Sequence, residues 1–380
     1  MAAPSANAGV VNPQPQTTAQ TAGGPFIRYS EEGFKPMYKS TGNAFSALIQ
    51  DPLVSAPGYA RRFRFRLTAS GGVNGTTTVA AAADAPWNAV QQIVVTSPGG
   101  TQLMQGDGYG LLHLVNKYGG QSGLWAYGAP DALPNFAAVS TGSSGTGDFV
   151  AASTLPLEAA KGYGVISMAS ASELPTISVQ LAPSSSVYTT APGTVPTLTL
   201  ALGLDYYWLP LDSNIEPPGL GSTMQWNKQT AYPGIGSASN VEVNVPKLGG
   251  YISTFIFVLR DSTGARIDAF PDPISFYLDG VPVFNQKPLA DVEDDMANQF
   301  QLASGFLRET GVLVFTRKTP LAQVEMGLLD TGEGYLSSNP GTSVILQGTW
   351  GTITNAPATL SCYAGQFVPS GAMLRGLLEQ

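Results

Sequence analysis

The chain has 380 residues, of which 12% are charged, and its formal net charge is −8. Ordinary globular proteins carry about 25% charged residues, so much of this surface is predicted to face other protein subunits rather than water. The acidic balance argues against electrostatic binding of nucleic acid by the chain as a whole, because such binding needs a basic surface. The length also exceeds the roughly 250–300 residues at which one core stops growing, which favours two domains.

Residues 1–24 carry no charged side chain and have neither a helical nor a strand period. Such a segment buries too little surface to offset its own ordering entropy. It is predicted to be either an arm held by a neighbouring subunit or a flexible tail. The sequence shows no secretory signal and no run of 18 apolar residues, so synthesis and folding in a cytoplasm are expected.

From about residue 45, short apolar runs alternate with glycine, proline, asparagine and aspartate. Few charges, many turn-forming residues and 43% hydrophobic residues predict an all-β protein with many short strands. The best candidate linker is "EPPGLGS" at 216–222. The predicted division is an N-terminal arm and lead-in at 1–44, a first barrel at 45–215, a second barrel at 216–369, and a short C-terminal helix or tail at 370–380.

Alternating or apolar runs mark the individual strands along both halves. The predicted strands are 59–70, 90–100, 162–170, 176–183, 196–211, 239–246, 251–261, 272–284, 311–318, 342–353 and 359–367. The Asp279-Gly280 pair within 272–284 is typical of a tight hairpin turn between two strands.

Helices are predicted at three places. One face of 289–305 collects apolar residues at three- and four-residue steps: Leu289, Val292, Met296, Phe300 and Ala303. The acidic run at 291–295 suits the first turns of a helix, and a cation site is the less favoured alternative because EF-hand spacing is missing. A counterpart is predicted at 108–120. The third, at 370–380, would present a candidate inter-subunit tail: Met373, Leu374, Leu377 and Leu378.

Two predicted strands repeat one another at an offset of 192 residues, "YARRFRFRLTAS" at 59–70 and "YISTFIFVLRDS" at 251–262. Each is followed by strand, turn, strand and short helix, which predicts one barrel design used twice. Their matched apolar positions are expected to fill equivalent barrel interiors: Phe63, Phe65 and Leu67 in the first copy, and Phe255, Phe257 and Leu259 in the second.

The other face of the repeat differs between the copies. The first copy carries three arginines there, and burying an unpaired guanidinium would cost several kcal/mol. That face is therefore predicted to meet water or a neighbouring subunit, or an anionic surface such as lipid headgroups or nucleic acid. The matching Ile256 and Val258 predict that the second copy's outer face is covered. The candidate contact residues are Arg61, Arg62, Arg64 and Arg66.

Catalytic signatures are missing from the sequence. One cysteine, Cys362, and one histidine, His113, allow neither an intrachain disulfide nor a His/Cys metal cluster. Cys362 is predicted to be a small buried hydrophobe, and His113 to be packed or at an interface. The "GDGYG" segment at 106–110 lacks dinucleotide-loop spacing and is predicted to be a turn. No catalytic residue, cofactor or metal ligand is predicted, and the chain is not expected to be an enzyme.

Three blocks carry a family resemblance: "QDPLVSAPGYARRFRFRLTAS" at 50–70, "NAVQQIVVTSPGGTQLMQGDGYGLLHLVNKYGG" at 88–120 and "LDYYWLPLD" at 204–212. With the two barrel-sized halves and the near-uncharged arm, they resemble the double jelly-roll major capsid proteins of tailless, icosahedral double-stranded DNA viruses. The likeness is greatest to tectivirus-like phages with an internal membrane. The resemblance implies an all-β fold of two consecutive eight-stranded antiparallel jelly-roll barrels with a few short helices.

The resemblance also implies a homotrimer whose six barrels form a near-hexagonal capsomer, with trimers tiling an icosahedral virion shell and no catalysis. Penton and minor capsid proteins are further implied partners, an underlying lipid membrane is another candidate, and sequence-specific nucleic acid is not expected. The arm lacks the amphipathic helix that family members often carry, so membrane contact through the arm is not implied.

Two other classes of protein stay open. A two-domain β-sandwich protein of a virion that binds a receptor or carbohydrate would expose aromatic residues such as Trp125, Trp226 or Trp350 in a groove. A jelly-roll enzyme would need a metal or an acid pair, and its turnover would depend on His113.

Overall fold

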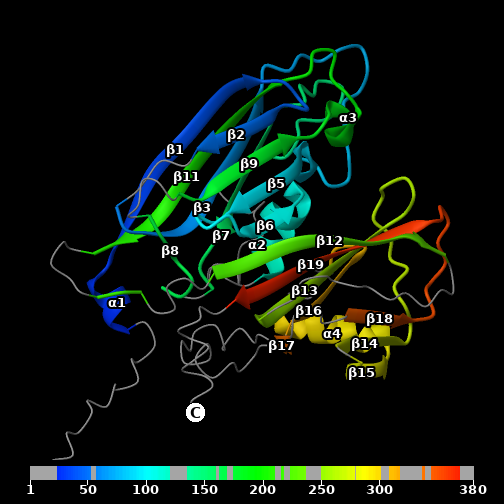
Figure 1. Ribbon diagram of the computed structural model, residues 1–380. Coiled ribbons are helices and arrows are strands. Elements are labelled where there is room, and N and C mark those ends of the chain that lie inside the picture. The colour runs from blue at the N-terminus through cyan, green and yellow to red at the C-terminus, as the bar shows by residue number, and fades with distance from the viewer. Residues whose placement is uncertain are drawn as a thin grey trace, which may run out of the picture.

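Most of the regular structure in the described residues is β-strand, arranged in two barrels built from successive halves of the chain (Figure 1). No helix within the described ranges is long and apolar enough to cross a lipid bilayer. The computed structural model describes residues 24–52, 57–119, 135–159, 162–168, 174–209, 215–217, 223–236, 250–278, 280–300, 308–316, 336–338 and 344–368.

The first barrel packs two antiparallel sheets against one another. The strand order of one sheet is β1-β11-β3-β7, with β8 paired to β3, and the order of the other is β6-β5-β9-β2. The first sheet contains β1 (Glu31–Asn43), β3 (Tyr59–Ser70), β7 (Phe149–Pro156), β8 (Ile166–Ser167) and β11 (Thr197–Trp208). The second contains β2 (Leu48–Pro52), β5 (Val90–Thr96), β6 (Gln102–Gly106) and β9 (Thr176–Leu181).

Short elements complete the first barrel. A two-stranded ladder pairs β4 (Ala80–Ala81) with β10 (Tyr188–Thr190). The helices are α1 (Gly24–Tyr29), η1 (Trp87–Ala89), η2 (Tyr109–Leu114), α2 (Val115–Tyr118) and α3 (Ser184–Val187). The π-wound η2 runs directly into α2, and the two together are called the inter-barrel helix below.

The second barrel repeats this plan. Its first sheet has the order β12-β19-β13-β16, with β17 paired to β13, and its second has the order β15-β14-β18. The first sheet contains β12 (Thr223–Ile235), β13 (Gly250–Arg260), β16 (Val312–Thr316), β17 (Leu336–Ser338) and β19 (Ala358–Val368). The second contains β14 (Ile274–Leu278), β15 (Val281–Lys287) and β18 (Val344–Gly348), and α4 (Leu289–Gln299) follows β15. A short parallel pairing of β12 with β6 joins the two barrels.

The repeated strands β3 and β13 hold the same place in the two barrels. Each is third in its sheet, between β11 and β7 in the first barrel and between β19 and β16 in the second. Each also bulges at the same point, because the ladder register skips Arg61 in β3 and Ser253 in β13, which are 192 residues apart. The predicted double use of one barrel design is confirmed.

The inward faces of both repeated strands are buried, as predicted. Their six apolar side chains are at most 1% exposed: Phe63, Phe65, Leu67, Phe255, Phe257 and Leu259. Full burial of one such side chain contributes about 1.5–3 kcal/mol, so each set is a substantial part of its core. In the second barrel the rings also pack edge to face, with Phe255 and Phe276 at 5.4 Å between centroids.

Several predicted boundaries differ from the structure. The pattern does not predict β1, which lies within the predicted lead-in at 1–44, so the first sheet begins upstream of residue 45. Pro36 interrupts its alternation, and an edge strand tolerates proline because one row of N–H groups is unpaired. Within residues 162–168, the described part of the predicted strand at 162–170, the strand is limited to the two-residue β8. The arm at 1–23, the strand at 239–246 and the segment 370–380 lie outside the described residues.

The hairpin and two helices agree with prediction. Leu278 pairs with Val281 across a two-residue turn, and Gly280 adopts φ 74°, the left-handed geometry that such turns require. Asp279 itself lies outside the described residues. The segment predicted as a helix at 108–120 forms η2 and α2, and the N-terminal part of 289–305 forms α4.

Candidate functional site

Three of the four candidate arginines lie on the outer face of the β1-β11-β3-β7 sheet. Asp205 on β11 accepts hydrogen bonds from Nε of Arg62 at 2.6 Å and from Nε of Arg64 at 2.8 Å. The Arg62 side chain is 17% exposed and that of Arg64 is 55% exposed, and Arg66 is exposed as well. One carboxylate thus offsets part of the charge, and the remaining charge faces outward.

Arg61 lies apart from the other three because it is the bulged residue of β3. Its side chain is 12% exposed and forms ion pairs with Glu158 and with Glu32, the latter at 2.7 Å. Burial alone would lower the pKa of Arg61, but the charge of Glu158 outweighs it and the pKa is raised. Arg61 therefore belongs to a partly buried ion-pair cluster inside this chain, in which Glu158 is buried and Glu32 is exposed.

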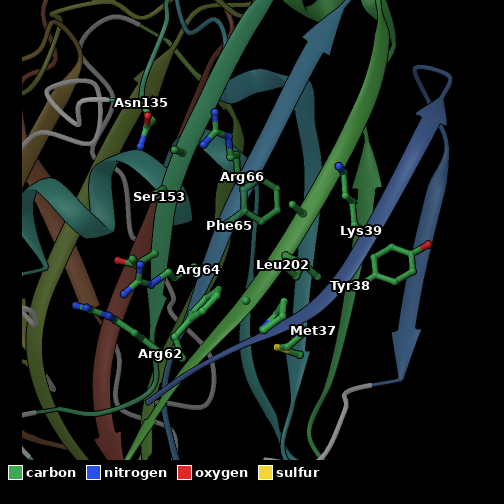
Figure 2. A pocket seen from close by; sticks show the side chains of 16 residues that line it. Met37, Tyr38, Lys39, Arg62, Arg64, Phe65, Arg66, Asn135, Ser153 and Leu202 are labelled. Carbon is green, nitrogen blue, oxygen red and sulfur yellow. The ribbon is translucent and has the colours of Figure 1, made fainter. Parts of the chain in front are cut away.

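A groove of about 700 Å³ runs along the same outer face. Its floor is made of small residues, among them Ala152, Ala201 and Gly203, and Figure 2 shows Arg62, Arg64, Arg66 and Lys39 along it. The Phe34 ring is 53% exposed and lies 5.0 Å from the Arg64 guanidinium, a cation–π contact. This surface is called the basic groove below, and it combines cationic side chains, an exposed ring and a small-residue floor.

The inter-barrel helix covers the outer face of the second barrel's β12-β19-β13-β16 sheet. Gly110 lies against the Tyr363 ring, and a Cβ on Gly119 would come within 2.9 Å of the Trp226 ring. Beneath the helix, Ile256 and Val258 are 0% and 1% exposed. The prediction that the outer face of the second repeated strand is covered is therefore confirmed, and the cover is the chain's own first half.

A polar cluster fixes this helix to the second barrel. Tyr109, His113 and Lys117, spaced one turn apart, all contact the Glu309 carboxylate, at 2.5, 2.8 and 2.5 Å. Burial opposes ionisation of Glu309, but the hydrogen bond and charge of His113 and the charge of Lys117 outweigh it, so its pKa is lowered. His113 is 5% exposed, which confirms the prediction of a packed interface histidine. The pattern gave no signal for Glu309.

The "GDGYG" segment lies in the same interface. The Asp107 carboxylate accepts hydrogen bonds from Lys228 Nζ at 2.6 Å, from the Tyr363 hydroxyl at 2.9 Å and from the Gly110 backbone N–H at 2.7 Å. Burial opposes its ionisation, yet Lys228 and the hydrogen bonds lower its pKa. The predicted turn is not found: the segment runs from the end of β6 directly into the start of the inter-barrel helix, and its carboxylate joins the two barrels.

The described residues hold no group of three or more His, Cys, Asp or Glu side chains arranged for a metal ion. Cys362 is free and fully buried, as predicted. Trp226 and Trp350 are 0% and 3% exposed, so neither forms the exposed aromatic groove that a carbohydrate-binding protein would need. Trp125 lies outside the described residues, as do the candidate tail residues: Met373, Leu374, Leu377 and Leu378.

Two stacked sandwiches with matched strand order define a double jelly-roll fold. No protein-family model and no curated protein matches the chain by sequence. Solved structures match over nearly the whole chain, and they are double jelly-roll major capsid proteins.

Three of these structures illustrate the likeness. The major capsid protein of STIV has 17% identity and a TM-score of 0.59, and the match covers 89% of this chain and 97% of that one. A chain from the atomic structure of Sulfolobus turreted icosahedral virus has 14% identity and a TM-score of 0.59, with 92% and 96% covered. The major capsid protein P2 of bacteriophage PM2 has 9% identity and a TM-score of 0.52, with 90% and 99% covered.

Proposed function

We propose that this chain is a viral major capsid protein whose role is structural. The observation that carries the proposal is the repeated barrel, which has equivalent strand order and equivalent bulges in both halves of one chain. Structural similarity along nearly the full length to major capsid proteins, one of them from an icosahedral virus, supports it. Rigid barrels with buried ion pairs suit a load-resisting shell, and no reaction is proposed.

The proposed functional unit is a homotrimer. Three chains supply six similar barrels, and rotational symmetry closes them into a near-hexagonal ring with one repeated contact. Obligate interfaces of this kind bury roughly 2,000–5,000 Å² or more, in keeping with a chain in which 12% of residues are charged. Neighbouring trimers would then tile an icosahedral shell, so the protein would reside in the virion after synthesis in a host cytoplasm.

Finer features of this proposal follow from the family resemblance. We include contacts with penton and minor capsid proteins, an internal membrane beneath the shell, and a role for the segment 370–380 in linking subunits. The barrels would divide at the linker 216–222, with β1 added to the first barrel. Nothing in the described groove or interface favours a receptor- or carbohydrate-binding function.

The experiment that tests the proposal is native mass spectrometry and electron microscopy of the purified full chain. We expect a persistent complex of three 39.5 kDa chains and pseudo-hexagonal particles in micrographs. A stable monomer that forms neither trimers nor larger assemblies, at concentrations up to those found in an infected cell, would contradict the proposal.

A further inference from the structure

The two equivalent sheets differ in what covers their outer faces. In the second barrel, Trp226 and Tyr363 on the outer face are 0% and 2% exposed because the inter-barrel helix lies over them. In the first barrel the same face is the basic groove, where Phe34 is 53% exposed. The outer face of the first barrel's β1-β11-β3-β7 sheet is therefore uncovered, whereas the equivalent face of the second barrel is covered by a helix.

The strand registers relate the outer faces of the two equivalent sheets residue by residue. Phe34 lies opposite Asp205 on the neighbouring strand, just as Trp226 lies opposite Gly365, and the offset from Phe34 to Trp226 is again 192 residues. Both positions hold a large aromatic ring on the outer face. Only the ring beneath the inter-barrel helix is buried.

The residues at the centre of the two outer faces also occupy equivalent positions. Arg64 lies opposite Gly203 in the first barrel, and Ile256 lies opposite Tyr363 in the second. Ile256 is 0% exposed, whereas the Arg64 side chain is 55% exposed. The first barrel has Gly203 in place of the tyrosine, and the Phe34 ring lies directly over it, at the point where the helix crosses in the second barrel.

The helix equivalent to the inter-barrel helix is α4. Each follows the second strand of a hairpin, β5-β6 or β14-β15, and each packs on the strand at the edge of the opposite sheet, β7 or β16. Asn116 of the inter-barrel helix bonds to Thr154 on β7 at 2.8 Å. Val292 and Met296 of α4 pack beside Phe315 on β16. In both barrels the helix thus closes the same side.

The outward face of α4 is small and acidic. Val292 and Met296 are buried against the barrel, and the opposite side of the helix presents Ala290, Asp291, Asp294, Ala297 and Asn298, all exposed except the half-buried Ala297. Small residues permit close approach to a sheet, as Gly110 does in the inter-barrel helix and Gly119 does directly after it. The two aspartates carry the charge that complements a basic groove.

We propose that the basic groove of one chain receives the acidic outward face of α4 from a second copy of the same chain. This proposal rests on the trimer proposed above and specifies which surfaces meet. A chain cannot fill its own groove with its own α4, because the two lie at opposite ends of the molecule (Figure 1). The contact is therefore head to tail, and such a contact closes into a ring of three when each chain is rotated by about 120° from the previous one.

The contact within the chain and the proposed contact between chains also differ in the signs of the charges that they bring together. The inter-barrel helix carries Lys117 and meets a carboxylate, Glu309, on the second barrel. The intermolecular contact reverses these signs, with an acidic helix on a basic sheet. If the inter-barrel helix of one copy bound the basic groove of another, Lys117 would lie near Arg64 and Arg66. Like charges at an interface are repulsive, so this pairing is disfavoured.

Charge reversal tests the contact in the full chain. The groove variant is Arg64→Glu with Arg66→Glu, the helix variant is Asp291→Lys with Asp294→Lys, and the double-face variant carries all four changes. We expect each single-face variant to dissociate at a concentration at least about tenfold higher than the wild type, and the double-face variant to recover the wild-type trimer. Light scattering after size-exclusion chromatography measures the mass. Arg28→Glu, an exposed change on α1, is the matched control and should leave the trimer unchanged.

Mixing the two single-face variants adds a test of symmetry. In a ring of three, any mixture leaves one contact between faces of like charge, so trimers should not return, whereas a ring with an even number of chains would be restored. Circular dichroism should match the wild type in every variant, and the thermal midpoint should match it in the helix variant, whose changed side chains are exposed. The groove variant should show a lower thermal midpoint, because Arg64 also pairs with the buried Asp205. Failure of the double-face variant to reassemble would overturn the pairing with α4.

The remaining outcomes separate this inference from the proposed function. Trimers that persist in all variants would overturn the inference and leave the capsid function standing, whereas a monomeric wild type would contradict the function itself. Loss of flotation with phosphatidylglycerol vesicles in the groove variant, with its trimer intact, would assign the groove to anionic lipid and overturn the inference.

Discussion

Glu309 offers the sharpest test of what holds the two barrels together. Its carboxylate is 16% exposed and serves three partners from the inter-barrel helix, Tyr109, His113 and Lys117. Glu309→Gln keeps the shape but removes the charge. Breaking one partner of a buried ion pair costs about 3–5 kcal/mol, and the amide retains some hydrogen bonding, so we expect a loss of about 3 kcal/mol at neutral pH. That is roughly a hundredfold in the unfolding equilibrium.

The pH dependence identifies the charge as the cause. An unfolded glutamate has a pKa of about 4.3, and the folded-state pKa of Glu309 is lowered by His113 and Lys117 despite its burial. The stabilisation is therefore fully present above the unfolded value and is lost as the pH falls toward the folded one. The stability gap between the wild type and Glu309→Gln should shrink as the pH falls below about 5.

Urea denaturation followed by tryptophan fluorescence measures this gap, because Trp226 and Trp87 lie beside the inter-barrel helix. Glu31→Gln, at an exposed position of β1, controls for a general loss of one negative charge. Equal urea midpoints for the wild type and Glu309→Gln at pH 7 would refute the reasoning. A gap that stays the same down to pH 3 would show that shape rather than charge is responsible.

Three further predictions concern packing. Gly110→Val would drive a side chain into the Tyr363 ring, so a cost of about 1–3 kcal/mol should lower the thermal midpoint. Gly99→Val, at a surface turn where a Cβ meets only Ser97 Oγ at 3.9 Å, should not lower it. Phe257→Ala empties part of the second barrel's core and should cost about 3–5 kcal/mol by calorimetry; a loss below 1 kcal/mol would contradict the assignment of Phe257 to a packed core. Burial raises the pKa of the Cys362 thiol, which disfavours the reactive thiolate, so the native protein should not react with a disulfide reagent at pH 8 until urea unfolds it, and prompt reaction would contradict the burial.

Sequence pattern predicts those parts of the fold that depend on local periodicity. The inward faces of β3 and β13 alternate strictly, the β14-β15 hairpin has a specific turn residue in Gly280, and α4 has a regular apolar face. The edge strand β1 and the polar strand β12 escape prediction because neighbouring strands, rather than their own side chains, determine their conformation.

Contacts set by register are harder to predict from sequence. Asp205 meets Arg62 across 143 residues of chain, and only the ladder between β11 and β3 brings them together. A lone carboxylate in the apolar run "LALGLDYYW" is itself a signal, because a buried charge needs a partner. Glu309 carries no such signal, since its partners lie on a helix of the other barrel.

The outer faces of β3 and β13 differ in sequence because they are covered at different stages of folding and assembly. The outer face of β13 is covered by the same chain as it folds, so Ile256 and Val258 never remain exposed to water and their burial stabilises the monomer. The proposed partner of the β3 face is a separate molecule, and until it arrives that face must stay soluble. Arginines keep it hydrated and avoid a large exposed apolar patch, which would promote aggregation. They also attract an acidic helix through long-range charge, which raises the association rate more than the final affinity.

Arg64→Ile with Arg66→Val, which copies the second strand onto the first, should therefore yield a chain that associates indiscriminately rather than as a trimer. Light scattering that shows the same trimer at the same concentration would refute this account.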